Sequence, residues 1–355
     1  MRVEQITFTR FLAAIAIVIY HYALNLFPFN SGILHDIFKQ ATVGVSYFFI
    51  LSGFVMIIAY GKKADINTND YFRNRFARIY PVYLLAILLI FIHFILNKQD
   101  IDISGLLLNV FVIQAWVPEK AIAFNSPGWS LTVEFLFYAV FPYLLKYFYK
   151  ARNYRKVLVP VIAIWLLSQL LFNLLAASSF NKGFETASYN FLYYFPVMHL
   201  NEFLIGNLAG LFFIKINEKA FRNYDWQILI LAVLILVALK FPMGMNYHNG
   251  LLAVLFVPFI LLVSLNTGKI TGLFNHPWLV FLGEISYGIY ILQYPVFTWT
   301  RSVLKFIHIR DNSMVFYISF IMLIIVSGVS YHYIETPLRN KIKNWRFKRV
   351  AGPVS

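Results

Sequence analysis

Residues 79–96 read IYPVYLLAILLIFIHFIL, a run of eighteen residues without a Lys, Arg, Asp or Glu. An α-helix of that length measures about 27 Å, close to the thickness of the hydrocarbon core of a bilayer. Comparable apolar runs recur along the whole chain. The sequence therefore predicts an all-α polytopic membrane protein with ten transmembrane helices, at roughly 6–26, 39–60, 79–96, 129–149, 157–177, 196–214, 226–241, 250–266, 278–298 and 314–334.

The composition agrees with this prediction. Only 13% of the 355 residues are charged and 60% are hydrophobic, whereas soluble domains carry about 25% charged residues. The absence of cysteine excludes disulfides, thiol nucleophiles, iron–sulfur clusters and zinc–cysteine sites. The net charge of +15 does not indicate nucleic acid as a partner, because Lys and Arg in a membrane chain mainly set its orientation. The expected surroundings are membrane lipids.

The distribution of basic residues predicts the orientation. If the N-terminus is cytoplasmic, the cytoplasmic segments hold 21 Lys and Arg and the opposite segments hold 8, which favours N-in and C-in. An additional apolar segment at 103–116 is too short to span comfortably, and a crossing there would send the basic loop 146–156 outside. We therefore expect a transmembrane domain at 1–345, a basic cytoplasmic tail at 346–355 and no extracytoplasmic soluble domain.

Two ionisable residues interrupt the first apolar run. Arg10 and His21 are eleven residues apart, about 20° beyond three helical turns, so both project from one helix face about 16.5 Å apart. Ionisable groups are costly in hydrocarbon, which makes each one a functional hypothesis. The structural alternative is that Arg10 reaches lipid headgroups and His21 is a hydrogen-bonded interior residue.

Further acidic and histidine residues are predicted at a similar depth. Glu134 lies five residues after Trp129, at the start of the fourth span. A carboxylate there would fix the tautomer of His21 and raise its basicity. The structural alternative is that Glu134 pairs with another helix for stability alone. His199 and Glu202 begin the sixth span, so we expect a polar chamber. No pair has a close ligand spacing such as HExxH, and no metal site is predicted.

Arginines alternate with aromatic residues just before the third span. Arg75 and Arg78 are three residues apart on one helix face. They have two interpretations: contact with anionic lipid headgroups, or binding of a phosphorylated substrate.

The motifs resemble those of the acyltransferase-3 family of integral-membrane O-acyltransferases over nearly the whole chain. The sequence departs from the family at Phe135, where a second Glu is frequent, and at Gln293, where a His is common. The motifs that carry the resemblance are the pair Arg10 and His21, FFILSGF at 48–54, RFARIYP at 75–81, WSLTVE at 129–134 followed by FY at 137–138 and FP at 141–142, EF at 202–203 with Gly206, SYGIY at 286–290 with Pro295, and ETP at 335–337.

The resemblance implies transfer of an acyl group, usually acetyl, from cytoplasmic acyl-coenzyme A to a hydroxyl of a cell-surface or lipid-linked carbohydrate. It implies a bacterial inner membrane and no permanently bound cofactor. The acceptor hydroxyl needs a general base, which we assign to His21, with Glu134 orienting it. The remaining assignments are Arg10, Arg75, Arg78 and Ser52 for donor binding, and Trp129, Ser130, Glu202 and Tyr287 as acceptor or oxyanion candidates.

Several alternatives stay open. O-antigen, exopolysaccharide, glycolipid, peptidoglycan and an antibiotic precursor are all possible acceptors, and transfer is either direct or through an acyl-serine. On composition alone, a proton-coupled transporter or flippase would use the same His and Glu residues. Transporters usually show internal repeats, and none is evident here. A non-catalytic membrane anchor would not need Arg10 and His21 on one face.

Overall fold

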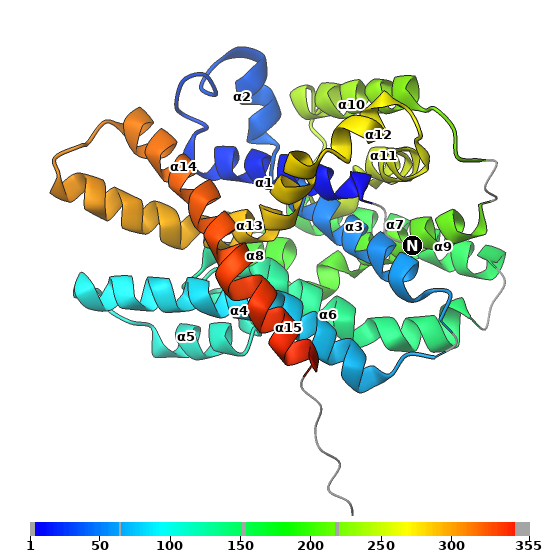
Figure 1. The fold of residues 1–355 in the computed structure, drawn as a ribbon, viewed down its shortest axis with the longest axis horizontal. Coiled ribbons are helices and arrows are strands. Elements are labelled where there is room, and N and C mark those ends of the chain that lie inside the picture. Colours follow the sequence, from blue (N-terminus) through cyan, green and yellow to red (C-terminus); the bar gives the residue numbers. More distant parts are fainter. Residues whose placement is uncertain (1–3, 64, 151–153, 217–219, 345–355) are drawn as a thin grey trace, which may run out of the picture.

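The computed structural model describes residues 4–63, 65–150, 154–216 and 220–344; the predicted tail at 346–355 lies outside them. Every regular element in these residues is a helix (Figure 1). The prediction of an all-α polytopic membrane protein is therefore confirmed.

Eight helical segments of the described residues are long and apolar enough to cross a membrane. Helices α10 (Asp225–Lys240) and α11 (Ala253–Leu265), which coincide with two predicted spans, are shorter, so the count of ten stays a prediction. The eight segments are α1 (Gln5–Tyr22), α3 (Val43–Tyr60), α4 (Thr68–Leu96), Ser126–Tyr149 with α6 (Trp129–Tyr143), α7 (Tyr154–Ala177), Ala187–Lys215 with α8 (Ala187–Tyr194) and α9 (Leu200–Lys215), α13 (Pro277–Phe306), and Asn312–Asn344 with α14 (Asn312–Ser330) and α15 (Thr336–Asn344).

Helix α4 is longer than the predicted span at 79–96. It starts at Thr68, where the side chain of Asn67 accepts a hydrogen bond from the backbone N–H of Asp70 and caps the first turn. Arg75 and Arg78 consequently lie on the same continuous helix as the apolar run. This rigid connection fixes the two arginines relative to the interior of the bundle.

The short apolar segment at 103–116 does not form a spanning helix. It contains only the eight-residue helix α5 (Ile103–Val110). Lys120 donates to the Asp102 carboxylate at 2.7 Å, and Asn109 donates to the backbone carbonyl of Ala123. The chain that follows α5 therefore lies beside the residues that precede the helix. The hydrogen bonds from Lys120, Ser104 and the Gly105 N–H lower the pKa of Asp102 to about 2. The structure agrees with the prediction that this segment does not cross.

Glycines let the central helices touch backbone to backbone. A Cβ atom on Gly53 of α3 would overlap the carbonyl oxygen of Phe203, and one on Gly206 of α9 would overlap that of Ile50. Gly53 and Gly206 belong to the second-span and EFxxG motifs, so the role of both glycines is close packing. Gly283 of α13 meets the backbone of α1 in the same way.

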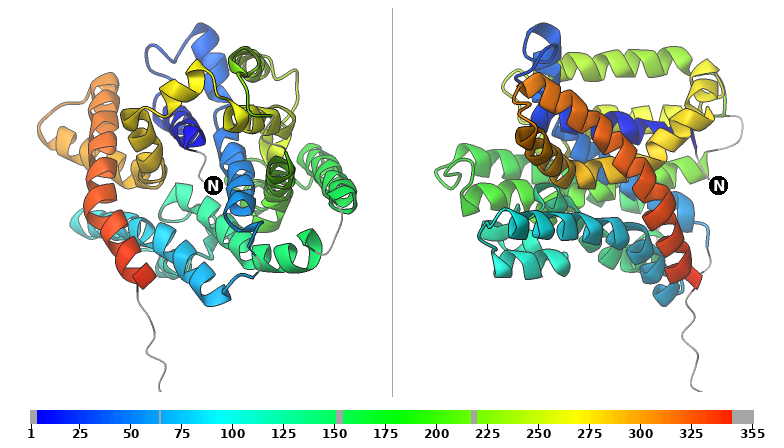
Figure 2. Two further views of the ribbon diagram at one scale, coloured as in Figure 1. Left: turned by 45° about the vertical axis from the view of Figure 1, so that its right-hand side comes forward. Right: turned by 60° about the vertical axis from the view of Figure 1, so that its left-hand side comes forward.

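Helix α1 lies inside the bundle, in contact with α3 and α13 (Figure 2). The loops gather at its two ends. Asn190 donates to the Pro118 carbonyl and Asn246 to the Tyr193 hydroxyl at one end. At the other end, Arg222 and Asn266 form an isolated parallel β-bridge. In each case the joined segments are ones that the charge distribution predicts on the same side of the membrane, and the orientation itself stays a prediction.

Cysteine labelling tests the predicted orientation in this cysteine-free chain. Lys62 and Lys182 are both exposed and lie in loops predicted on opposite sides. We expect an impermeant maleimide to label Lys182→Cys in intact cells, and Lys62→Cys only after permeabilisation, because the loop around Lys62 is rich in basic residues. The reverse labelling pattern would contradict the N-in orientation.

Candidate active site

His21, near the end of α1, is held by a single well-defined hydrogen bond. Its Nδ1 lies 2.8 Å from the Oε1 atom of Gln293 on α13, and the Nε2 of Gln293 donates to the Tyr290 carbonyl at 2.7 Å. A carbonyl oxygen only accepts, so the Gln293 amide must point its Oε1 at His21. Nδ1 of His21 is therefore the donor, and Nε2 of the neutral ring carries the lone pair.

The free nitrogen of His21 is accessible. The side chain is exposed although its helix lies in the bundle, and Nε2 forms no hydrogen bond within the described residues. Tyr20 and Tyr22 flank the ring, with centroids 5.4 and 6.0 Å away. An accessible imidazole of fixed tautomer is suited to take a proton from a bound hydroxyl group. We call this part of the site the His21 end.

The other end of the same helix face carries an unpaired guanidinium. The charges of Arg78, Glu134 and Glu335 lie close enough to act on Arg10. Neither Arg10 nor Arg78 forms a hydrogen bond or ion pair with another described residue. Their N–H groups are available to an external acceptor, and guanidinium groups match phosphate geometry. We call this part of the site the Arg10 end.

Arg75 lies beside this pair and is fixed by aromatic side chains. It donates to the Tyr60 hydroxyl at 3.3 Å, and its guanidinium lies over the rings of Tyr60 and Tyr138 at 5.5 and 5.7 Å. Both Arg75 and Arg78 act electrostatically on Tyr138. The three predicted donor-binding arginines are thus brought together.

The predicted contact between Glu134 and His21 is wrong. The Glu134 carboxylate accepts from the Tyr138 hydroxyl at 2.6 Å and from Ser52 at 3.3 Å, and it interacts with Arg10. Glu134 therefore belongs to the Arg10 end, whereas Gln293 orients His21. Glu134 instead pairs with Tyr138, one helical turn further along α6, and with Ser52 on α3; a similar depth in the membrane does not determine which neighbours a side chain contacts.

Three hydroxyl groups among the predicted site residues already donate within the protein. Ser52 donates to Glu134, Ser130 to the Pro127 carbonyl at 3.0 Å, and Tyr287 to the Ile79 carbonyl at 2.7 Å. Tyr287 and Ser52 lie at the Arg10 end, where Glu134 acts on Tyr287. None of the three offers a free O–H in this arrangement.

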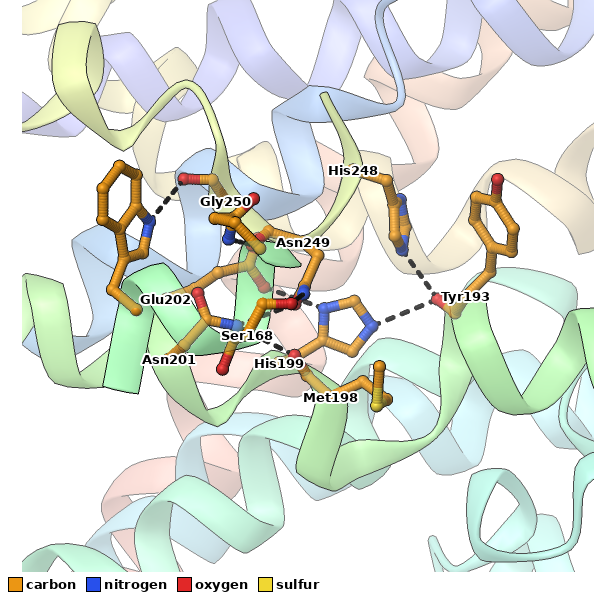
Figure 3. A network of polar contacts seen from close by, with 11 residues as sticks. Ser168, Tyr193, Met198, His199, Asn201, Glu202, His248, Asn249 and Gly250 are labelled. Atoms are coloured by element: carbon orange, nitrogen blue, oxygen red, sulfur yellow. Dashed lines mark hydrogen bonds and ion pairs between the residues drawn. The ribbon is translucent and has the colours of Figure 1, made fainter. Parts of the chain in front are cut away.

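Glu202 is separated from the site. It is completely buried, and its Oε2 atom lies 2.8 Å from Nδ1 of His199 (Figure 3). Trp129, which is also buried, covers His199 with a ring distance of 5.2 Å. Glu202 consequently cannot contact an acceptor in this structure, contrary to its assignment from the sequence.

The network around Glu202 joins α9 to the segment between α10 and α11. His199 and His248 both donate from Nε2 to the Tyr193 carbonyl, at 3.1 and 2.9 Å (Figure 3). Burial, with a contribution from His199, lowers the pKa of His248 to about 3. Asn201 donates to Asn249 at 2.7 Å. The described residues contain no group of three or more His, Asp or Glu arranged to hold a metal ion.

The sequence reasoning did not assign three residues that the structure places in the site: Gln293, Tyr138 and Glu335. Glu335 lies at the end of a π-helical turn (Tyr331–Glu335), a form of helix that is frequent at functional sites. It is buried, lies 3.5 Å from Arg339, and acts on Arg10. The feature of the sequence that could have identified Glu335 is its position in the ETP motif at 335–337.

An accessible base and an unpaired arginine on one face of α1, with Arg75 and Arg78 of α4 near the arginine, suit an enzyme that transfers a group within a membrane bundle. The family model described as an acyltransferase domain matches residues 3–332. The chain belongs to this acyltransferase-3 family and is an O-acyltransferase.

Characterised relatives are similar along most of the chain. It is 29% identical over 325 residues to the acyltransferase MdmB of Streptomyces mycarofaciens, covering 83% of this chain and 79% of MdmB. It is 26% identical over 363 residues to the peptidoglycan O-acetyltransferase OatA of Listeria monocytogenes, covering 95% of this chain and 56% of that protein. For the O-acetyltransferase OatA of Staphylococcus aureus the identity is 23% over 360 residues, covering 94% and 56%.

The chain therefore spans a little over half the length of the two OatA proteins. No solved structure matches it.

Proposed function

We propose that the protein transfers an acetyl group from acetyl-coenzyme A to a carbohydrate hydroxyl at the bacterial cytoplasmic membrane. The observation that carries this proposal is the pairing of an accessible His21, whose Nε2 is free, with the unpaired Arg10 on the same face of α1. The spacing of about 16.5 Å separates an anion-binding end from a base.

The Arg10 end suits the donor. Coenzyme A is strongly anionic, and Arg10, Arg75 and Arg78 present guanidinium groups to bind its phosphates. Its pantetheine arm would then extend along α1 and bring the thioester towards His21. Glu134 and Glu335 balance part of the positive charge, which lowers the cost of keeping two arginines together when no donor is bound.

The His21 end suits the acceptor. Nε2 of His21 takes the proton from the acceptor hydroxyl as its oxygen attacks the thioester carbonyl. The carbon–sulfur bond then breaks, the acyl–oxygen bond remains, and coenzyme A leaves as a thiol that carries the proton. This direct transfer needs no covalent enzyme intermediate.

The names of the relatives support the acyl group and the acceptor class. The OatA proteins are O-acetyltransferases, and the Listeria protein is named for peptidoglycan. Because this chain spans only part of their length, we take from them the acetyl group and a glycan acceptor, and not peptidoglycan itself.

Release of free coenzyme A thiol tests the function. We expect protein reconstituted in nanodiscs to release thiol from acetyl-coenzyme A when a cell-surface glycan extract is present, with an acetyl-sized mass increase on the glycan. Heat-denatured protein and donor without glycan are the controls. A transporter or flippase would release no thiol and leave the glycan mass unchanged, which would refute the proposal.

A further inference from the structure

A cavity of about 380 Å³ is lined by residues of the three helices α7, α9 and α11. Helices α7 and α11 both pack on α9 (Figure 1). The volume is within the range of about 300–1,000 Å³ that is usual for ligand sites. Of the described residues that line it, none is charged, and only Tyr154 and Trp165 carry a polar side-chain atom. The cavity therefore suits a hydrocarbon chain.

The length of the cavity is close to that of one bilayer leaflet. Along α7 its lining extends from Tyr154 to Trp165, eleven residues that rise about 16.5 Å. Half of the hydrocarbon core of a bilayer is about 15 Å thick. At the far end, the indole N–H of Trp165 donates to the Gly250 carbonyl at 3.0 Å and joins α7 to the segment before α11. One acyl chain of one leaflet fits between these ends.

The side of the cavity is open to the surroundings of the bundle. Each helix contributes an exposed apolar side chain to its lining: Ile162 from α7, Phe212 from α9 and Val254 from α11. The first two belong to segments that are long and apolar enough to cross a membrane. In a bilayer these side chains contact lipid tails, so an acyl chain can enter the cavity sideways.

A positive charge lies at the Tyr154 end. Lys215, the last residue of α9, places its ammonium nitrogen 4.8 Å from the centroid of the Tyr154 ring. Lys215 is exposed and forms no ion pair with another described residue, and the Tyr154 hydroxyl forms no hydrogen bond with one. Both groups can donate to a phosphate at the point where an acyl chain leaves the cavity.

The sequence around this end is basic. The flanking segments 146–156 and 215–225 contain eight Lys and Arg and two acidic residues, Glu218 and Asp225. The Asp225 carboxylate accepts from backbone N–H groups at the start of α12 (Lys269–Phe274), and Glu218 lies outside the described residues. Basic residues beside spanning helices attract anionic lipid headgroups.

We propose that this cavity binds one anionic phospholipid from the leaflet that faces Lys215, which is the cytoplasmic leaflet in the predicted orientation. One acyl chain lies on α9 between α7 and α11, and the phosphate accepts hydrogen bonds from Lys215 and the Tyr154 hydroxyl. A zwitterionic lipid would bring its own cationic group close to Lys215, so the site prefers an anionic headgroup. The proposal does not depend on the transferase function.

Lipid titration of the purified full chain tests this site. The protein is stripped of lipid in detergent, and dioleoyl phosphatidylglycerol or dioleoyl phosphatidylcholine is added, so that the two probes differ only in the headgroup. Native mass spectrometry counts the bound lipids and gives the affinity of the first. We expect one phosphatidylglycerol to bind at least about fivefold more tightly than phosphatidylcholine, the effect of one lysine near an anionic headgroup.

Removing the charge tests the headgroup contact. Lys215→Gln should weaken binding of phosphatidylglycerol about fivefold and leave binding of phosphatidylcholine unchanged. Lys269→Gln is the matched control, at an exposed lysine predicted on the same side of the membrane, and should behave as the wild type.

Filling the cavity tests the place of the acyl chain. Val254→Trp adds bulk at an exposed position of the lining and should weaken binding of both lipids about tenfold, because an overfilled site no longer accepts the chain. Val233→Trp adds the same bulk at an exposed position on α10, outside the cavity, and should leave both affinities unchanged.

Three results would overturn the inference: equal binding of the two lipids by the wild type, wild-type binding by Lys215→Gln, or wild-type binding by Val254→Trp. Displacement of bound phosphatidylglycerol by an equal amount of a polyprenyl phosphate would also overturn it, because the occupant would then be a prenyl lipid. The transferase function fails separately, through the absence of thiol release.

Discussion

His21→Ala is expected to lower acyl transfer by about 10²–10⁴-fold while donor binding stays at the wild-type level. A general base acts chiefly in the transition state, so its loss appears in kcat and not in the affinity for acetyl-coenzyme A. The measurement is thiol release at saturating donor, with donor binding measured on the same preparation. Because His21 is accessible, added imidazole should restore part of the activity.

Two further variants make this test specific. Gln293→Leu removes the acceptor for Nδ1 and should give a turnover between those of the wild type and His21→Ala, because the ring keeps its place but not its tautomer. His276→Ala, at an exposed residue at the start of α13, should behave as the wild type. Near-normal transfer by folded His21→Ala would eliminate the mechanism.

Arg10→Ala and Arg78→Ala are each expected to weaken binding of acetyl-coenzyme A by at least about tenfold, because each removes charge-assisted hydrogen bonds to phosphate. Arg10→Lys should recover only part of the affinity, since an ammonium lacks the planar fork of donors. Isothermal titration with a non-hydrolysable acetyl-coenzyme A analogue measures the effect.

The donor itself supplies a control for this prediction. Acetyl-pantetheine has the same arm without the nucleotide phosphates, so its KM should be similar in the wild type and in Arg78→Ala. Arg73→Ala, on the same helix but paired with Asp70 at 2.5 Å, should leave donor affinity unchanged. Equal losses for both donors would place Arg78 outside the phosphate-binding region.

The sequence predicted the membrane class, the apolar helices and the short segment that does not cross, because each depends on the length of an apolar run. Arg10, Arg75 and Arg78 were also grouped correctly, since the motifs place them at the same end of their helices. These predictions rely on local periodicity and on the distribution of charge.

The sequence did not predict which side chains on different helices contact each other. Gln293 is 272 residues from His21, and nothing in either segment identifies the pair. Glu134 was assigned to His21 from depth alone, but a side chain on a helix can reach partners one turn, about 5.4 Å, along the axis, and the carboxylate pairs with Tyr138 and Ser52. Glu202 was assigned from its depth, but the sequence cannot reveal that the carboxylate is completely buried against His199, which Trp129 covers in turn.

Helix α1 runs unbroken from Gln5 to Tyr22, so in the proposed mechanism it fixes the distance between the anion bound at Arg10 and the bond that reacts at His21. Inserting one residue between Arg10 and His21 would turn the imidazole by about 100° and move it about 1.5 Å. This fixed distance also selects donors by the length of the arm that joins their charged groups to the acyl carbon. An acyl phosphate, whose carbonyl carbon is attached directly to the phosphate, cannot reach Nε2 while its charge stays on Arg10. In the proposed mechanism, selection of the donor is therefore set by the backbone of one helix.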